Sequence, residues 1–323
     1  MTVQDHLRDL LESNKSVYLS GEEIARRLGV SRNAVWKAIK ALQSGGYHIA
    51  AAPDRGYCLA ANSDVLSDSG IRRYLTGEAQ ALDLIVYDAV DSTNLVLRAR
   101  GRGRAGGHGR DRRRTDRRQR AQGRSFYSPQ GTGVYVSLLL KPKIAPDDAT
   151  LITTTAAVAV CGALEALSGK PAEIKWVNDV FMDGKKVCGI LTEGSFDMES
   201  GMFEYAVLGV GINVYTPTGG FPPEIADIAG SALSSPAPDA KNRAVAEYLN
   251  RFLPLYRSLG SAETAAEYRR RSFVIGREIT VLSESGETPA RALDVDDRCR
   301  LVVEYADGRR EALSTGEISI KVR

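Results

Sequence analysis

Residues 99–124 read ARGRGRAGGHGRDRRRTDRRQRAQGR, with eleven arginines and, apart from three alanines, no apolar side chain. Such a segment cannot join a hydrophobic core, because burying guanidinium groups without partners is very costly. We therefore expect residues 98–122 to be looped out or disordered. The whole chain has 323 residues, 43 % of them hydrophobic, which is enough for two or three domains with cores of their own.

The basic charge of the chain is local. The whole chain has a formal net charge of +3, and residues 99–124 alone carry +9. The remaining residues therefore sum to −6. Neither a signal peptide nor an apolar run of about 20 residues is apparent, which predicts a cytoplasmic protein that does not enter a membrane. The cysteines lack the spacing of metal ligands, so we expect reduced, buried thiols. They are Cys58, Cys161, Cys188 and Cys299.

Residues 1–62 carry the pattern of a winged helix-turn-helix. Apolar residues recur at helical spacing over residues 3–13, and Ser20-Gly21-Glu22-Glu23 predicts a capping box that starts a second helix. Gly29 ends that helix, and Ser31 can cap a third. The segment YHIAAAPDRGYCL alternates around a Pro-Asp-Arg-Gly turn, which predicts a two-stranded wing.

The third predicted helix has one apolar and one polar face. In a helix-turn-helix this helix enters the major groove of DNA. The residues that we expect to contact DNA are Ser31, Arg32, Asn33 and Lys37. A small helical bundle with a solvated basic face is the alternative. Because one module makes few contacts, specific binding to operator DNA predicts a homodimer on a two-fold site.

Strand-like and helix-like segments alternate from about residue 66 to residue 270, which is typical of an α/β or α+β domain. The strand-like segments include ALDLIVYDAV and GTGVYVSLLLK. Short strings in this region carry polar and glycine residues of the kinds found in ligand sites. They are DSTN from Asp91, GRSFYSPQGTGVYVS from Gly123, KWVNDVFMDGKKVCGILTE from Lys175 and GVGINV from Gly209.

Together with the N-terminal helix-turn-helix, these strings resemble the bifunctional biotin–protein ligases that also act as biotin operon repressors. Residues 273–323, which include GREITVL and STGEISIKV, look like the SH3-like barrel that ends this family. The resemblance covers nearly the whole chain. It implies an α+β protein with a winged helix-turn-helix at 1–62, a central α/β catalytic domain at 66–270 and a C-terminal SH3-like β-barrel at 273–323. Lipoate ligases share the catalytic fold but lack the combination of an N-terminal DNA-binding domain with this C-terminal domain.

The resemblance implies a two-step reaction. Biotin and ATP form biotinyl-adenylate, and a lysine on the biotin carboxyl carrier domain of acetyl-CoA carboxylase or a similar carboxylase then takes the biotinyl group. Lys186 matches the family's active-site lysine, and a cation there would stabilise the negative charge of both transition states. We expect its neighbour Lys185 to be a solvated turn residue.

Further residues match the family's ligand-binding positions. Those implied for biotin are Ser92, Thr93, Asn94, Arg124, Lys186 and Gly189. Those implied for the nucleotide and its phosphates are Lys175, Asn178, Asp179, Gly209, Gly211 and Asn213, with Asp179 also a ligand of Mg²⁺. From the residues alone, the Ser-Thr-Asn string could equally cap a helix, and the glycines could serve a strand crossing. The family usually has proline at the position of Val177. This difference makes the turn less rigid but removes no ligand-binding side chain.

The arginine-rich segment departs from the family, because only Gly123 and Arg124 match its GRGRRGR loop. Three interpretations are open: an arm that binds nucleic acid, a solvated loop, or a stretch translated out of frame between compensating shifts. Unchanged length and a lost apolar strand favour the third, which predicts weakened biotin binding and adenylate retention. A non-catalytic, ligand-sensing winged-helix regulator is the alternative function, and Lys186 with the KWVND string favours the ligase.

Overall fold

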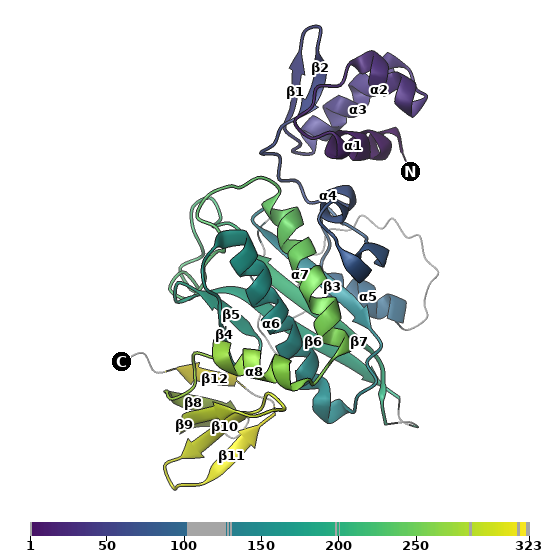
Figure 1. The fold of residues 1–323 in the computed structure, drawn as a ribbon. Coiled ribbons are helices and arrows are strands. Elements are labelled where there is room, and N and C mark those ends of the chain that lie inside the picture. Colours follow the sequence, from purple (N-terminus) through teal and green to yellow (C-terminus); the bar gives the residue numbers. More distant parts are fainter. Residues whose placement is uncertain are drawn as a thin grey trace. The chain divides into compact units, whose positions relative to one another are not determined.

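The computed structural model describes residues 2–101, 127, 129, 131–197, 199, 201–283, 286–314 and 317–320. These residues form two compact units, coloured along the chain in Figure 1. The first comprises Met1–Val86 and Leu233–Asn250, and the second comprises Tyr87–Ala232 and Arg251–Arg323. Arg124 and residues 102–122 lie outside the described residues, so expectations about them stay predictions. The predicted domain limits also stay predictions.

The first unit contains the expected helix-turn-helix and wing. Its elements here are α1 (Val3–Ser13), α2 (Gly21–Leu28), α3 (Arg32–Ser44), β1 (Ile49–Ala52) and β2 (Gly56–Leu59). Gly29 ends α2 with a φ of +65°, which glycine adopts without strain. Leu7, Ile24 and Ile39, one from each helix, are buried in a common core.

One predicted detail of α2 is wrong. Ser20 Oγ accepts a hydrogen bond from Glu23 N at 3.0 Å, as a cap requires. The Glu23 carboxylate, however, pairs with Arg27 one turn later, at 2.5 Å. The i,i+4 ion pair therefore replaces the return half of the capping box.

The first unit also includes α4 (Asp68–Arg72), the 3₁₀ helix η1 (Gly77–Ala81) and the start of α7 (Ala240–Arg257). Asn242 connects these parts, because its side chain accepts from Ser67 N at 3.0 Å and donates to Val65 O at 2.9 Å. Lys15, which follows the end of α1, forms an ion pair with buried Asp239.

The second unit is built on an antiparallel sheet. Its strands are β3 (Gly133–Leu140), β4 (Glu173–Lys175), β5 (Asp179–Met182), β6 (Lys185–Phe196) and β7 (Phe203–Asn213), in the order β3-β7-β6-β5-β4. All pairings between the described strands are antiparallel. Of the two classes that the sequence left open for this region, the structure is therefore α+β.

Helices lie on both faces of this sheet. α6 (Ala149–Ser168) covers one face, where Thr153 Oγ1 lies 2.8 Å from Thr192 Oγ1 of β6. α5 (Thr93–Gly101) lies on the other face, where Asn94 contacts Glu193, the next residue of β6. Because successive strand residues point to opposite faces, these two contacts assign the faces. Two further short elements are η2 (Pro146–Asp148) and α8 (Ala262–Arg271).

The segment Pro146–Ser168 is the one stretch of described helix that is long and apolar enough to cross a membrane. In the structure 67 % of that window is buried, and its helix packs on β6. It has the character of a core helix.

The C-terminal part is a second antiparallel sheet with the order β11-β10-β9-β8-β12. Its strands are β8 (Glu278–Ser283), β9 (Gly286–Val295), β10 (Leu301–Tyr305), β11 (Arg310–Leu313) and β12 (Glu317–Ile320). The turn before β10 reaches the central sheet region, where Trp176 Nε1 donates to Cys299 O at 3.0 Å.

Two expectations about the chain around the arginine-rich segment are wrong. Residues 81–90, expected as a strand, form none, and Ile85, Tyr87 and Val90 are exposed. An alternating segment becomes a strand only beside a partner, and no described strand lies beside this one. Residues 98–101, expected to be looped out, continue α5.

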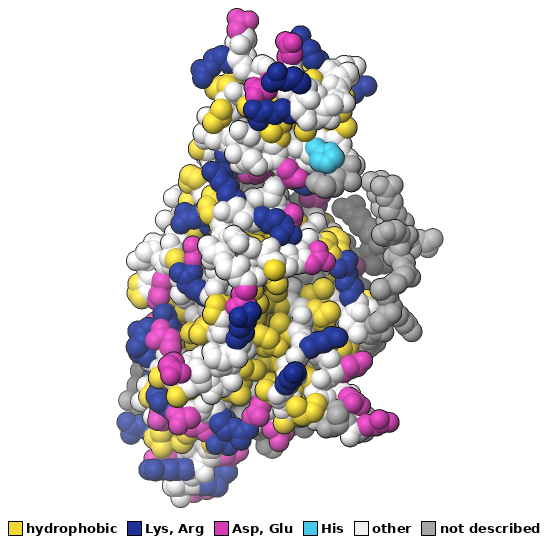
Figure 2. Space-filling view, turned by 45° about the vertical axis from the view of Figure 1, so that its right-hand side comes forward, with side chains coloured by type: hydrophobic (Ala, Val, Ile, Leu, Met, Phe, Trp, Pro, Cys, Tyr) yellow, Lys and Arg dark blue, Asp and Glu magenta, His cyan; other side chains and the backbone are white. Residues whose placement is uncertain are grey.

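The expectation of reduced thiols is confirmed, because all four cysteines are free and buried. On the face shown in Figure 2, Lys and Arg side chains are interspersed with Asp and Glu side chains. This mixture agrees with a basic charge that is concentrated in one segment of the sequence.

Candidate active site

Lys186 lies near the start of β6, where that strand pairs with β5. Val180 is opposite Cys188, but the next residue, Phe181, is opposite Lys186. Val187 is therefore the extra residue of a β-bulge. Since side chains alternate along a strand, the bulge turns the Lys186 side chain to the face of the sheet that Phe181 occupies.

Asp179 occupies the same face, two residues before Phe181. Lys186 Nζ lies 2.6 Å from Asp179 Oδ1, and the side chains are 30 % and 19 % exposed. The Lys186 backbone is fixed by Ile228 O, which accepts from its N–H at 2.7 Å, and by Gly230 N, which donates to its carbonyl at 2.8 Å. A fixed, partly exposed ammonium group on this face is suited to an anionic ligand.

Glycines lie beside Asp179 on the same face. Gly189 of β6 is opposite both Asp179 of β5 and Gly211 of β7. Gly209, two residues away on β7, is opposite Ser137 of β3. Gly189 and Gly209 are partly exposed, and Gly211 is buried. Positions without side chains let a ligand approach the backbone closely.

Ser92, Thr93 and Asn94 lie at the start of α5 over this face. Ser92 Oγ accepts from Leu95 N at 3.3 Å, so the serine caps the helix. Thr93 Oγ1 and Asn94 Oδ1 lie 2.6 Å and 2.5 Å from Ser137 Oγ of β3. The string therefore both caps a helix and builds a polar cluster.

Asn94 is 7 % exposed and fully engaged with protein groups. Its Nδ2 donates to Glu193 Oε2 at 2.9 Å, and Arg98 Nη1 donates to Glu193 Oε1 at 2.9 Å. A Cβ at Gly209 would lie only 2.4 Å from Asn94 Oδ1. In this structure Gly209 makes room for Asn94, and its contact with phosphates stays a prediction.

The asparagines predicted to bind the nucleotide hold backbone segments around Lys186. Asn178 Nδ2 donates to Ile190 O of β6 at 2.8 Å. Asn213 Nδ2 donates to Gly230 O at 3.0 Å, in the segment that bonds the Lys186 backbone. These contacts position the site, and the contacts of both residues with a nucleotide stay predictions.

Lys175 and Asp179 are opposite each other across the turn between β4 and β5. Val177 lies within this turn, and the turn forms without the proline that is usual there. Lys185, expected to be a solvated turn residue, begins β6 instead. Its Nζ donates to the carbonyls of residues 226 and 227, at 3.3 Å and 2.5 Å, in bonds that are themselves exposed to solvent.

The expected Mg²⁺ position at Asp179 offers one carboxylate. Within the described ranges, no group of three or more His, Cys, Asp or Glu residues could hold a metal. Mg²⁺ usually keeps several waters and binds through one or two carboxylates together with substrate phosphates. Asp179, with the Asn178 amide oxygen beside it in the chain, fits an ion that arrives with a nucleotide.

The predicted DNA-contacting residues are accessible on α3. Ser31 Oγ caps the helix by accepting from Ala34 N at 3.2 Å. Arg32, Asn33 and Lys37 are exposed. Sequence reasoning missed Trp36, which is 51 % exposed on the same helix.

Sequence reasoning also missed Ser137, Glu193 and Arg98. Ser137 interrupts an otherwise apolar strand segment, and that interruption was the available signal. Glu193 lies between Thr192 and Gly194, where the strand carries no such signal. Arg98 stood at the edge of the arginine-rich segment and was grouped with it. In the structure all three belong to the cluster around Asn94.

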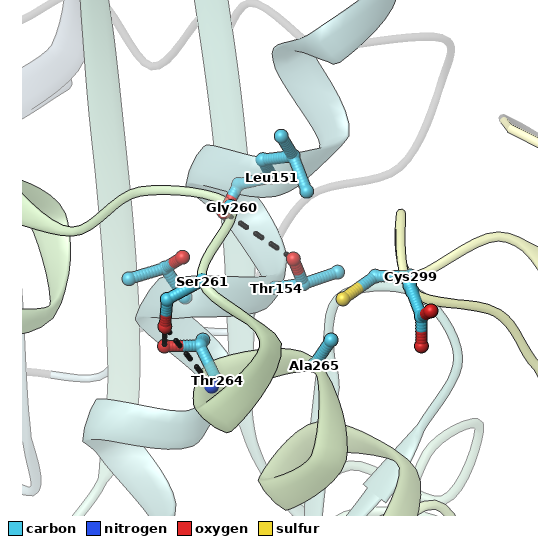
Figure 3. Close-up of a pocket in the computed structure, with 9 residues that line it drawn as sticks. Leu151, Thr154, Gly260, Ser261, Thr264, Ala265 and Cys299 are labelled. Carbon is cyan, nitrogen blue, oxygen red and sulfur yellow. Dashed lines mark hydrogen bonds between the residues drawn. The ribbon is translucent and has the colours of Figure 1, made fainter.

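A shallow hollow lies elsewhere in the second unit, between α6, α8 and the turn before β10 (Figure 3). Its lining includes Leu151, Thr154, Thr264 and Cys299, and none of the described residues predicted to bind ligand. Burial raises the pKa of the Cys299 thiol, which disfavours a reactive thiolate.

Family comparisons agree with this architecture. An HTH domain model matches residues 3–58, the Biotin/lipoate A/B protein ligase family matches residues 114–213, and the Biotin protein ligase C terminal domain matches residues 274–321. The bifunctional ligase/repressor BirA of Bacillus subtilis is 32 % identical over 320 residues, which are 97 % of each chain. The chain belongs to the bifunctional biotin–protein ligase and repressor family. The resemblance inferred from the sequence is confirmed.

Other members of this biotin–protein ligase family match over shorter lengths. Escherichia coli BirA is 29 % identical over 204 residues, 60 % of this chain and 59 % of that protein. A point mutant of the biotin protein ligase of Aquifex aeolicus, in complex with biotin, superimposes with a TM-score of 0.57 at 22 % identity, covering 74 % of this chain and 98 % of the other. At that identity the superposition supports the fold.

Proposed function

We propose that this chain is an ATP-dependent biotin–protein ligase that also acts as a biotin-responsive transcriptional repressor. It joins biotin and ATP into biotinyl-adenylate with release of pyrophosphate. It then transfers the biotinyl group to a lysine of a carboxylase carrier domain, which forms an amide bond. Relatedness to bifunctional ligase/repressors over 97 % of the chain supports both activities.

One observation carries the proposal for the site. Lys186 and Asp179 lie on the same sheet face as the Thr93–Asn94 cluster, and glycines occupy the positions between them. From β5 to β7 is two strand spacings, about 10 Å. That span lets one ligand contact the polar cluster at one end and the ammonium group at the other.

Lys186 is the residue that we assign to the reacting centre. Its ammonium group stabilises negative charge as the biotin carboxylate attacks the α-phosphate, and again as the carrier lysine attacks the mixed anhydride. Thr93 and the cluster behind it hold the ureido ring. Asp179 holds Lys186 when no anion is present and faces the phosphates. Asp179 and Asn178 would hold a Mg²⁺ ion, which would neutralise phosphate charge.

The repressor activity is assigned to the first unit. Arg32, Asn33 and Lys37 of α3 contact operator DNA, with base edges and phosphates as their partners. A homodimer formed by the ligand-bound chain presents two such helices to a two-fold site. The cytoplasm is the proposed compartment, which the free cysteines support.

For the arginine-rich segment we retain the out-of-frame interpretation. This interpretation rests on the unchanged length of the segment and its lack of an apolar strand pattern, and the match to the catalytic family model begins inside the segment, at residue 114. On this interpretation the chain as written makes and retains less biotinyl-adenylate than a version with an apolar strand and GRGRRG in place of residues 99–122. Sequencing the gene across codons 95 to 125 tests the origin of the segment directly.

Labelling of a purified biotin carboxyl carrier domain tests the enzymatic proposal. We expect biotin incorporation that requires ATP, and a higher rate from the segment-restored version. If neither version labels the carrier while both bind biotin, the chain is a ligand-sensing regulator without ligase activity, and the proposal is wrong.

A further inference from the structure

Trp36 is a large apolar side chain that α3 presents to solvent. It is 51 % exposed, whereas the other large apolar side chains of this helix, Val35, Ile39 and Leu42, are buried. Within the described part of the chain, the Trp36 indole forms no hydrogen bond, ring contact or cation–π contact. The indole is therefore available to a partner outside the chain.

The exposed side chains around Trp36 carry positive charge. Arg32 lies one turn before Trp36 and Lys40 one turn after it, and both are exposed, as is Lys37. α3 contains no acidic residue. Among the residues that the structure describes, Arg32, Lys37 and Lys40 form no ion pair. Positive charge that is left unpaired around an apolar ring favours a polyanion as the partner, and the charge of DNA is complementary to it.

The chemistry of the major groove limits what an indole can contact there. A helix in this groove faces the edges of stacked base pairs, so their ring faces are not accessible to it. Most groups on those edges are hydrogen-bond donors and acceptors, and covering them with an apolar ring would leave them unpaired at a cost. The apolar group that the edges offer is the C5 methyl of thymine. A contact between this methyl group and an indole buries apolar surface on both sides.

We propose that Trp36 is a specificity-determining residue of α3, whose indole packs against the C5 methyl group of a thymine in the major groove of the operator. Contacts of the surrounding basic side chains with phosphates orient the helix but carry no sequence information. Trp36 adds a preference for an A·T pair at one position of each half-site. This inference rests on the proposed repressor function.

The test uses the full chain with biotin and ATP, and a DNA duplex that this mixture selects from a random-sequence library. In that duplex each thymine is replaced in turn by uracil, which lacks the C5 methyl group but pairs in the same way. Equilibrium binding is measured for the unsubstituted chain, Trp36→Ala and Trp36→Phe. Val17→Ala is the matched control, because Val17 is also 51 % exposed in the first unit but lies outside α3.

For the unsubstituted chain, uracil at one thymine of a half-site should weaken binding about fourfold, the value of one buried methyl group. Trp36→Ala should bind the thymine duplex more weakly and lose nothing further at that uracil. Trp36→Phe keeps an aromatic ring and should keep the uracil penalty. The salt dependence of binding should not change in Trp36→Ala, because tryptophan neutralises no phosphate. Val17→Ala should match the unsubstituted chain in each measurement.

Three results would overturn the inference. The first is equally tight binding of the thymine duplex by Trp36→Ala and the unsubstituted chain. The second is the same uracil penalty for both proteins at every thymine, since Trp36 would then act without contacting a methyl group. The third is weaker self-association of Trp36→Ala, measured by sedimentation without DNA, that accounts for its whole loss of DNA binding. That result would place a second copy of the chain on Trp36.

The selection step separates failure of this inference from failure of the proposed function. If the unsubstituted chain selects no sequence from the library, the proposed repressor function is wrong, and this inference with it. If it selects a sequence and any of the three results above is found, the repressor function stands and only the role of Trp36 is wrong.

Discussion

Lys186 Nζ and Asp179 Oδ1 are 2.6 Å apart because a bulge at Val187 brings their side chains to one face of the sheet. Without the extra residue, Lys186 and Gly189 would point to opposite faces. The local irregularity of β6 therefore matters as much as the lysine itself. Bulges are common next to active sites for this reason.

Asp179→Asn should raise the KM for ATP about tenfold or more, because a carboxylate that faces phosphates and holds Lys186 loses its charge. The free energy of unfolding should change by less than about 1 kcal/mol, since the pair is partly exposed. Steady-state kinetics and chemical denaturation of the same preparations check both values. An unchanged KM for ATP would remove Asp179 from the nucleotide site.

Gly209→Ala should sharply weaken biotin binding, because its Cβ would lie 2.4 Å from Asn94 Oδ1 and displace the amide. Gly21→Ala is the control, since its Cβ would meet Tyr57 at an ordinary 3.5 Å in the first unit. Calorimetric titration with biotin measures both. Equal affinities for the two variants would contradict the proposed use of this face.

Arg32→Ala or Lys37→Ala should weaken operator binding and reduce its salt dependence by about one unit of slope for each lost phosphate contact. Lys170→Ala removes a charge from the second unit and should leave the slope unchanged. Titrations of labelled operator at several salt concentrations give the slopes. A slope unaffected by either α3 substitution would assign DNA binding to other residues.

Glu267 gives the stability a defined dependence on pH. The hydrogen bond from Arg270, with a further one from Arg271, lowers the pKa of Glu267 to about 2 from 4.5. A carboxylate whose pKa is lowered by folding stabilises the fold at any pH above its pKa in the unfolded chain. That stabilisation is lost as the pH falls toward its pKa in the folded chain. Glu267→Gln should therefore reduce the free energy of unfolding at pH 7, with the difference shrinking between about pH 4.5 and pH 2. A difference that is constant over this range would contradict the assignment.

Much of this fold could be read from the chain, because its signals are local. Only a few neighbouring residues determine the helix cap at Ser31, the positive φ of Gly29 and the turn of the wing. The expected strand at residues 81–90 does not form, because a strand needs a partner that the segment itself does not supply. The family motifs predicted Lys186 and Asp179 as site residues. That both side chains lie on one face of the sheet depends on a β-bulge that the sequence pattern does not predict.

The contacts behind the site were beyond sequence reasoning for the same reason. Asn94, Ser137 and Glu193 come from separate elements, and only the folded sheet brings them together. Glu23 is the opposite case. The capping-box motif predicted that its carboxylate would bond the Ser20 backbone, but the carboxylate pairs with Arg27 instead. Nonlocal contacts and competition between local ones are what the sequence alone left open.

The most direct test of this account is the amount of biotinyl-adenylate formed in a single turnover by the full chain and by two lysine variants. Lys186→Ala should lower the rate at least about 100-fold, the loss expected when one charge-stabilising group is removed from a reacting centre. Lys170→Ala is the matched control, because Lys170 also forms a 2.6 Å pair with an aspartate, Asp183, but on the exposed surface. We predict that the unsubstituted chain and Lys170→Ala form the adenylate at equal rates. Equal rates for Lys186→Ala and the unsubstituted chain would contradict the account.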